Sequence, residues 1–471
     1  MKLPINLTIA LLLAITGCVA LKPPQRWLDS GEKEKNTVQP VIVRRVEKVT
    51  RLTWEDALRK ARERNPTIAA AAQRIAIAEA RVREAQSLAF PTLDARGNYV
   101  RFMEAANFRG RTGSNVGGNT TRTRFFTGRG SDIYTAGLDL SYPVFDGGDA
   151  YYAREAAESS QTAAERDAEV VRRLLDLRTA EAFLNILLSR GATQIAQESL
   201  DFTRGEEGRA AARAEAGEGL RVDALRFATR ASEEQLALNR ALANRRVRIA
   251  ILAELLDVEF AEEAEFVIPN ESYDLPEGDL LEVALANRPE LKFFRARIEE
   301  VDHLVGRESA TWWPTISAFG SYGFITLDTI KLSDANDELQ VGANASMNLF
   351  EGGRTLARLS ALHAEKGVLR SEQKEVGLEI EREVREAQIE LDVSRENVAV
   401  SRETERLADE VLDRVTARYR AGNAQVLDVT ESQLQKTRAR LGLLRSRVNH
   451  VLAQVRPNHA LGLKVLRGRQ P

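Results

Sequence analysis

Apolar and polar side chains alternate strictly along residues 339–349. The apolar members are Leu339, Val341, Ala343, Ala345, Met347 and Leu349. Because successive side chains of a strand point to opposite faces, this pattern predicts a strand with one apolar and one polar face. The two glycines of Phe350-Glu351-Gly352-Gly353 then predict a sharp turn.

A very long helix is predicted directly after this turn. Residues 354–420 contain no proline and only two glycines, Gly367 and Gly377. A helix of this length extends about 100 Å. Within it, apolar residues recur at spacings of three, four and seven, which is typical of a coiled coil. They are Val376, Ile380, Val384, Ala387, Leu391 and Val398.

Four pairs of motifs indicate that the chain contains two copies of one unit. They are Asn65-Pro66 with Arg288-Pro289, Phe90-Pro91 with Trp313-Pro314, Phe145-Asp146-Gly147-Gly148 with Phe350-Glu351-Gly352-Gly353, and Ala216-Gly217 with Ala421-Gly422. The first two pairs share one constant separation, here called the longer offset (Pro66 to Pro289). The last two share another, the shorter offset (Gly147 to Gly352). The single change between the two offsets predicts an insertion in a loop of the first copy, where it costs little.

Each copy is predicted to contain a helix of about 35 residues, two strands, a long helix and a return helix. For the first copy, residues 51–256, the expected ranges are 53–88, 93–103, 133–145, 149–215 and 220–256. For the second copy, residues 276–457, they are 277–311, 316–324, 339–350, 354–420 and 426–455. The remaining segments are an extended lead (18–50), a connector (257–275) and a C-terminal tail (458–471).

Residues 1–17 are predicted to be a secretory signal. Lys2 precedes a short apolar run that ends in small residues before Cys18, the only cysteine of the chain. Ile15-Thr16-Gly17-Cys18 resembles a bacterial lipobox, which predicts lipidation of Cys18. Val19 at the next position favours the outer membrane. The alternative is an ordinary signal peptide with an incidental cysteine.

Composition narrows the function further. Charged residues make up 29% of the chain but nearly balance, with a net charge of −2, which does not favour nucleic acid as a partner. The four histidines are far apart and lack metal-ligand spacing, and no nucleophile motif or phosphate-binding loop is present. We therefore expect neither an enzyme nor a cofactor or metal site.

Four strands of bilayer-spanning length cannot close a barrel by themselves. An open sheet would leave unpaired amides and carbonyls in lipid, and the smallest single-chain membrane barrels have eight strands. We therefore expect several copies to share one barrel that continues into helices. The alternative is a coiled-coil protein with two amphipathic hairpins and no pore, acting as a periplasmic scaffold or adaptor.

The chain resembles the TolC-like outer-membrane efflux proteins over nearly all of its mature length. The motifs are Leu52-Thr53-Trp54-Glu55-Asp56-Ala57-Leu58 with Asn65-Pro66, Phe90-Pro91, Tyr142-Pro143-Val144-Phe145-Asp146-Gly147-Gly148, and Tyr419-Arg420-Ala421-Gly422 followed by Val426-Leu427-Asp428-Val429. The resemblance implies a homotrimeric exit duct with a barrel of twelve strands continuous with a helical tunnel. It also implies three partners: outer-membrane lipid, a periplasmic membrane-fusion adaptor, and an inner-membrane transporter of RND, ABC or MFS type.

The resemblance also assigns roles to individual residues. Asp428 and Glu431 match acidic positions that narrow the periplasmic entrance, and Tyr419 and Asp223 match contacts of the closed gate. The hairpin tips that would meet the adaptor contain Gly217, Gly219, Leu220, Gly422 and Leu427. Gly147, Gly148, Gly352 and Gly353 form the strand-to-helix turns.

Two alternatives remain open at these sites. Acidic residues in the first turns of a helix are also favoured by its dipole, so Asp428 and Glu431 could be purely local. Tyr419 could be simple packing. In addition, Ala424 replaces an arginine that often locks the closed state in the family.

Overall fold

The computed structural model describes residues 48–101, 132–267, 278–327 and 337–463, which belong almost entirely to one compact unit, Val49–Pro471. In chain order, the elements are β1 (Lys48–Thr53), α3 (Trp54–Arg64), α4 (Pro66–Ser87), β2 (Thr92–Arg101), β3 (Asp132–Phe145), α5 (Asp149–Glu215), α6 (Arg221–Leu256), β4 (Glu259–Val267), α7 (Leu280–Asn287), α8 (Pro289–Ala310), β5 (Thr315–Leu327), β6 (Asp337–Ser346), α9 (Arg354–Arg420) and α10 (Val426–Ala460).

Four of the strands form one antiparallel sheet in the order β2-β3-β5-β6. Its two hairpins have equivalent registers, with Thr92 opposite Ser141 in the first and Thr315 opposite Ser346 in the second. The longer offset relates Thr92 to Thr315, and the shorter offset relates Ser141 to Ser346. Strands β3 and β5 join the hairpins. The duplicated unit is therefore confirmed at the level of strand register, while the predicted loop insertion between β2 and β3 lies outside the described residues.

The two faces of this sheet differ in polarity. One row across all four strands consists of Leu93, Leu140, Gly320 and Val341. The adjacent row, which points to the opposite face, consists of Asp94, Asp139, Ser321 and Gln340. On the polar face, Arg96 forms an ion pair with Asp139 of the neighbouring strand (3.1 Å). The predicted alternation of apolar and polar side chains thus continues from strand to strand in these two rows of the sheet.

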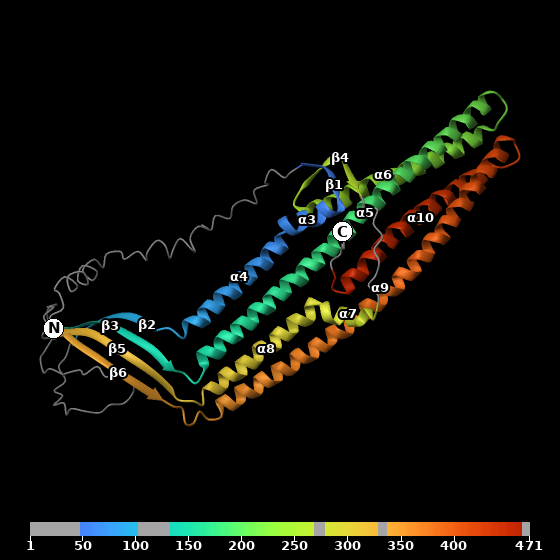
Figure 1. Ribbon diagram of the computed structural model, residues 1–471. Helices are drawn as coiled ribbons and strands as arrows, with labels where there is room; N and C mark the ends of the chain where they lie inside the picture. Colours follow the sequence, from blue (N-terminus) through green and yellow to red (C-terminus); the bar gives the residue numbers. More distant parts are fainter. Residues whose placement is uncertain (1–47, 102–131, 268–277, 328–336, 464–471) are drawn as a thin grey trace, which may run out of the picture. The chain divides into compact units, whose positions relative to one another are not determined.

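The helices continue from the sheet in two successive layers of contacts (Figure 1). Next to the sheet, the order of neighbours is α4–α5–α8–α9, and nearer the hairpin ends it is α6–α5–α10–α9. Helices α5 and α9 contain 67 residues each, or about 100 Å, and extend through both layers. Within the described ranges, the helices all fall short of the length and apolarity that a membrane span requires.

The first helix of each repeat is not continuous, contrary to the prediction. The range 53–88 divides at Asn65 into α3 and α4, and 277–311 divides at Arg288 into α7 and α8. Both residues are extended because each precedes a proline, which disfavours the helical region for its neighbour. Asn65 also caps α4 by accepting from the amide of Thr67 (2.9 Å). The proline begins a new helix instead of ending the old one.

The connector and the lead are also more ordered than predicted. Strand β4 lies inside the connector 257–275 and pairs with β1, whose first residues fall in the expected extended lead. Their small sheet lies against an aromatic cluster in which Phe183 makes edge-on contacts with Trp54 (5.5 Å) and Phe266 (5.9 Å). Because β1 and β4 lie far apart in sequence, neither repeat predicts their pairing.

Two predicted ends were also wrong. Strand β6 ends at Ser346 instead of Phe350, because its partner β5 begins only at Thr315, after Pro314. Helix α10 extends to Ala460, so it includes Pro457 and the first residues of the expected tail 458–471. It ends where Gly462 adopts a left-handed conformation (φ +76°).

Candidate functional site

Both helical hairpins end in the same turn. Gly217 and Gly422 have φ angles of +76° and +81°. In the second turn, Asn423 donates its amide to the carbonyl of Arg418 (2.8 Å), and the first turn has the equivalent bond. This is a Schellman motif, in which a residue other than glycine would be strained. The predicted tips are therefore two equivalent, glycine-dependent turns.

Tyr419 lies in a small core that joins the two hairpins. Its side chain is 8% exposed and contacts Phe227 edge-on, with the ring centroids 5.8 Å apart. Phe227 follows Asp223 by one helical turn. The other buried members of this tip cluster are Ala210, Leu412, Val426 and Val429. Tyr419 is thus a packing residue of this cluster, and Asp223, the other predicted gate residue, lies near enough for its charge to raise the pKa of Tyr419.

Charged groups surround the tip cluster. Glu206 is fully buried and accepts hydrogen bonds from Arg420 (2.6 Å) and Arg209. The guanidinium of Arg213 lies over the Tyr419 ring (5.6 Å) and donates to the carbonyl of Arg420 (3.1 Å). Burial, and then the negative charge of Asp223, raise the pKa of Tyr419. Sequence reasoning missed Phe227, Arg213 and Glu206, whose only signal was their position within a few turns of a tip.

The proposed constriction residues lie in the first turns of α10. Asp428 accepts from the amide of Gln425 (2.9 Å), which completes a capping box with the Gln425 side chain. Both Asp428 and Glu431 are exposed in the single chain. The local capping role of Asp428 is thus observed. The other carboxylate oxygen of Asp428 and the Glu431 side chain take no part in this cap.

Apolar side chains are exposed at the tips. Leu220 is 70% exposed and Leu427 is 62% exposed. Gly219 lies close to α5, since an added Cβ would be 3.0 Å from the Cβ of Arg213. Ala424, the departure from the family pattern, is half-buried and packs against the tip cluster. The tips therefore expose apolar side chains to a partner. Position 424 supplies packing and not the positive charge of the family's arginine.

The strand-to-helix turns contain the four predicted glycines, all with positive φ: Gly147 (+70°), Gly148 (+96°), Gly352 (+63°) and Gly353 (+84°). At Gly147 the reason is also steric, because an added Cβ would lie 2.7 Å from the carbonyl oxygen of Ala310. At Gly352 the same space is open in the single chain. The two equivalent turns thus differ in their neighbours.

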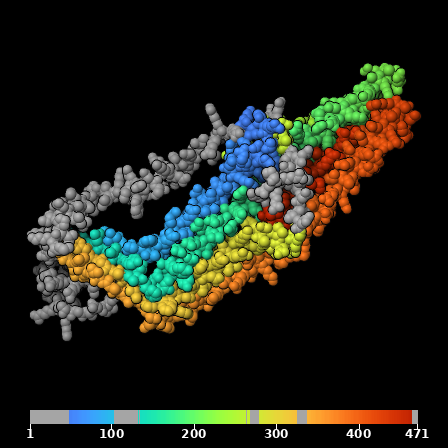
Figure 2. All heavy atoms as spheres, viewed as in Figure 1, coloured from blue at the N-terminus to red at the C-terminus, as the bar shows by residue number. Residues whose placement is uncertain are grey.

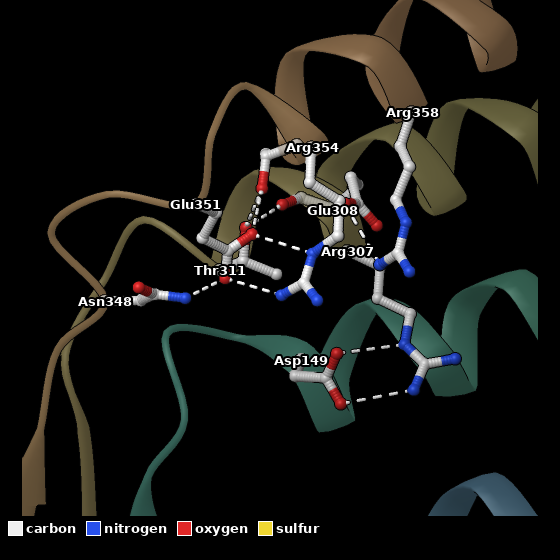
Figure 3. A network of polar contacts seen from close by, with 9 residues as sticks. Asp149, Arg307, Glu308, Thr311, Asn348, Glu351, Arg354 and Arg358 are labelled. Carbon is white, nitrogen blue, oxygen red and sulfur yellow. Dashed lines mark hydrogen bonds and ion pairs between the residues drawn. The ribbon is translucent and has the colours of Figure 1, made fainter.

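A polar network connects these turns to α8 (Figure 3). Asp149, in the first turn of α5, accepts two hydrogen bonds from Arg307 of α8 (2.9 and 3.3 Å). This pair raises the pKa of Arg307. In the second repeat, Arg354 instead binds Glu351 within its own turn (2.7 Å). The two repeats are therefore joined by an ion pair at the level where strands become helices.

Two further predictions concern sites elsewhere in the chain. Cys18, the predicted lipidation site, and the signal segment 1–17 lie outside the described residues. Among the described residues, no group of three or more histidine, aspartate, glutamate or cysteine side chains could hold a metal ion.

Comparison with known sequences gives one family. A family model described as outer membrane efflux protein matches residues 57–257 and 280–463. The outer membrane efflux protein BepC of Brucella suis is 23% identical over 332 residues, which cover 70% of this chain and 72% of BepC. The alkaline protease secretion protein AprF of Pseudomonas aeruginosa is 28% identical over 265 residues, which cover 53% of each chain.

Solved structures share the fold. CusC superimposes with a TM-score of 0.75 at 18% identity, covering 87% of this chain and 92% of CusC. The outer membrane protein VceC of Vibrio cholerae gives a TM-score of 0.72 at 19% identity, covering 87% of this chain and 96% of VceC. The open state of the MtrE channel of Neisseria gonorrhoeae gives 0.71 at 21% identity, covering 89% and 91%.

Proposed function

Because the chain belongs to the outer membrane efflux protein family, we propose that it is a homotrimeric exit duct, a passive conduit for substrates that an inner-membrane transporter drives. The protein is an outer-membrane protein whose helical body lies in the periplasm. Members of this family are channels, and no catalytic activity is indicated.

The observation that supports a conduit most directly is the two-faced sheet. The row Asp94, Asp139, Ser321 and Gln340 would be costly against lipid, whereas the row Leu93, Leu140, Gly320 and Val341 suits it. A sheet with its apolar face toward lipid and its polar face toward water is the wall of a water-filled pore. A periplasmic scaffold has no need of this arrangement.

The same sheet supports assembly of several copies. Strands β2 and β6 are its edges, and hydrocarbon cannot satisfy their unpaired backbone groups. Three copies of the four strands would close a barrel of twelve, and α4, α5, α8 and α9 would continue it as a helical tunnel. The exposed Leu220 and Leu427 at the tips would then contact a periplasmic membrane-fusion adaptor, which links the duct to the transporter.

We assign the entrance constriction to Asp428 and Glu431. In a trimer each would form a ring of three carboxylates, which favours cations over anions. The test is planar-bilayer recording of the purified trimer. We expect a cation-selective conductance in the natural protein, and weaker cation selectivity in the double variant Asp428→Asn with Glu431→Gln. The amide oxygen of the introduced asparagine can still accept from the amide of Gln425, so the helix cap is retained.

A matched control replaces an acidic residue away from the tips. Glu259→Gln, at an exposed position of β4, is expected to leave the selectivity unchanged. Equal selectivity in the natural protein and the double variant would contradict the constriction. Absence of any conductance from intact trimers would contradict the duct itself and favour the scaffold.

A further inference from the structure

The interface between the two repeats offers a template for the interface between subunits. Within the chain, β3 pairs with β5 and α5 packs on α8, so the end of repeat one contacts the start of repeat two. The equivalent elements, β6 with α9 and β2 with α4, form two free borders, here called the α9 border and the α4 border. Helix α9 follows one edge of the molecule without interruption in the space-filling view (Figure 2).

At the strand-to-helix level, the charges of this template are reversed on the free borders. The shorter offset relates Asp149 to Arg354, and the longer offset relates Arg307 to Glu84. In the inter-repeat pair, the acidic residue, Asp149, is on the long helix α5 and the basic residue, Arg307, is on the short helix α8. The free borders have the base on the long helix, at Arg354, and the acid on the short one, at Glu84.

Side-chain sizes are reversed at the same level. In the inter-repeat interface, the ring of Tyr152 on α5 occupies the space beside Gly306 on α8, where an added Cβ would lie 2.5 Å from the ring. The equivalent residues on the free borders are Ala357 on α9 and Arg83 on α4. Both pairs combine a large side chain with a small residue. The large side chain is on the long helix α5 in the inter-repeat interface, but on the short helix α4 on the free borders.

We propose that the α9 border of one copy binds the α4 border of the next in the register of the inter-repeat interface, with an Arg354–Glu84 ion pair in place of Arg307–Asp149. The proposal rests on the trimer proposed above and specifies how its copies recognise one another. Glu84 is exposed and forms no ion pair with any described residue. Arg354 is exposed in the first turn of α9, where its guanidinium already pairs with Glu351 of its own turn (2.7 Å) and would bind Glu84 in addition.

Burial at equivalent positions supports this occupant. Val368 and Ile389 on α9 are 55% and 62% exposed, whereas their equivalents on α5, Ala163 and Leu184, are 3% and 0% exposed. The α5 positions are covered within the chain, where α3, α4, α6, α8 and α10 pack around that helix. The α9 positions remain apolar and uncovered, as expected for a surface that a second copy buries.

The strand register can be stated residue by residue. Asp139 lies opposite Ser321 in the inter-repeat interface, and the two offsets convert this pair into Asn344 of β6 opposite Asn98 of β2. Two residues further, Ser346 lies opposite Arg96. Polar residues meet on one face of the shared sheet, while Ala343 and Ala345 meet Tyr99 and Gly97 on the other. A shift of one residue would place polar against apolar positions.

The reversal also disfavours pairing between like borders. Two α9 borders would place Arg354 against Arg354, and two α4 borders would place Glu84 against Glu84. Only the contact between unlike borders brings opposite charges together. Such a heterologous contact continues around a ring until it closes, whereas pairing of like borders would stop at a dimer.

Disulfide trapping tests the register. The full-length variant Asn344→Cys with Asn98→Cys is oxidised in membranes and analysed by denaturing, non-reducing gel electrophoresis. We expect a covalent trimer, because each copy supplies one cysteine to each neighbour. The control Ala345→Cys with Asn98→Cys places the two cysteines on opposite faces and is expected to remain monomeric. Single-cysteine variants report any contribution of Cys18.

Charge exchange tests the ion pair. Arg354→Glu and Glu84→Arg are each expected to lower the trimer association constant in detergent by roughly tenfold, because attraction becomes repulsion at three interfaces. The double exchange is expected to recover part of it, because Arg354→Glu also removes the hydrogen bonds to Glu351, which the second exchange does not replace. Failure of the double variant to recover while both single variants are impaired would overturn the assigned pair.

The outcomes separate this proposal from the proposed function. A natural protein that is monomeric by native mass measurement would contradict the trimeric duct. A native trimer that gives no crosslink at Asn344 and Asn98, or equal crosslinking in the shifted control, would overturn the proposed interface alone.

Discussion

At the scale of single residues, local and long-range roles coincide in the same side chain. Asp428 completes the cap of α10 through the amide of Gln425, whatever else it does at an entrance. Tyr419 is both a predicted gate contact and a buried member of the tip cluster. A substitution at such positions changes folding and function together. Conservative replacements that keep the local bond are therefore the informative ones.

His459, near the end of α10, is expected to make the protein sensitive to acid. Burial, with the charges of Arg173 and Arg288, lowers its pKa to about 3. The unfolded chain binds this proton near pH 6.5, so stability is full above that pH and falls as the pH decreases toward 3. At pH 5 the loss is on the order of 2 kcal/mol per chain.

Thermal unfolding followed by circular dichroism in detergent at pH 7 and pH 5 would measure this effect. His459→Gln is expected to reduce the difference between the two pH values, since the glutamine cannot be protonated. His363→Gln, at an exposed position of α9, is the control and should behave as the natural protein. Equal acid sensitivity in all three proteins would contradict the assignment.

At the scale of elements, the two repeats contain the same helices and membrane strands but differ in the segments that pack on these helices. Strands β1 and β4 pair with each other, and Phe183 of repeat one lies between Phe266 of β4 and Trp54 of α3. The equivalent position of repeat two is Gln388, which is exposed. The pair Arg62–Asp176, with hydrogen bonds of 2.7 and 2.6 Å, fixes α3 to α5 in the same region.

Phe183→Ala is expected to destabilise this aromatic cluster by about 3–5 kcal/mol, because it removes a fully buried ring between Trp54 and Phe266. We expect the amides of α3 and of the β1–β4 sheet to exchange their hydrogens with solvent faster than in the natural protein. Gln388→Ala is the matched control from repeat two and should change little. Similar exchange in both variants would show that the cluster does not hold these elements.

At the scale of the whole molecule, one long helix is covered within the chain and the other is not. Within the described residues, α5 packs against α3, α4, α6, α8 and α10, whereas α9 packs against α7, α8 and α10. The exposed apolar residues of α9 include Val368, Ile389 and Val400, at 55%, 62% and 66% exposure. Stability of the single chain and assembly of the trimer therefore depend on different residues.

The equivalent residues Leu184 and Ile389 separate these two properties. Leu184→Asp places a charge at a fully buried position and is expected to unfold the chain, with loss of the helical signal. Ile389→Asp is expected to preserve the helical signal of the chain and to abolish the trimer, measured by native mass determination. A stable trimer of Ile389→Asp would contradict the burial of this α9 position between subunits.

The sequence alone determined the duplicated unit, the class of fold and the bounds of α5 and α9, because these follow from periodicity, glycine turns and repeated motifs. It also located the tips and the strand-to-helix turns, where glycine is required by backbone conformation. It did not locate the divisions at Asn65 and Arg288, although the prolines that follow them were visible, because the helical pattern continues on both sides.

Only the tertiary structure decided which elements lie beside one another. The pairing of β1 with β4, the burial of Glu206 between arginines and the contact of Tyr419 with Phe227 join residues far apart in the chain. Periodicity specifies which face of an element is apolar but not what covers it. The register of β3 on β5 supplied that information, and with it the expectation that Arg354 of one copy meets Glu84 of the next.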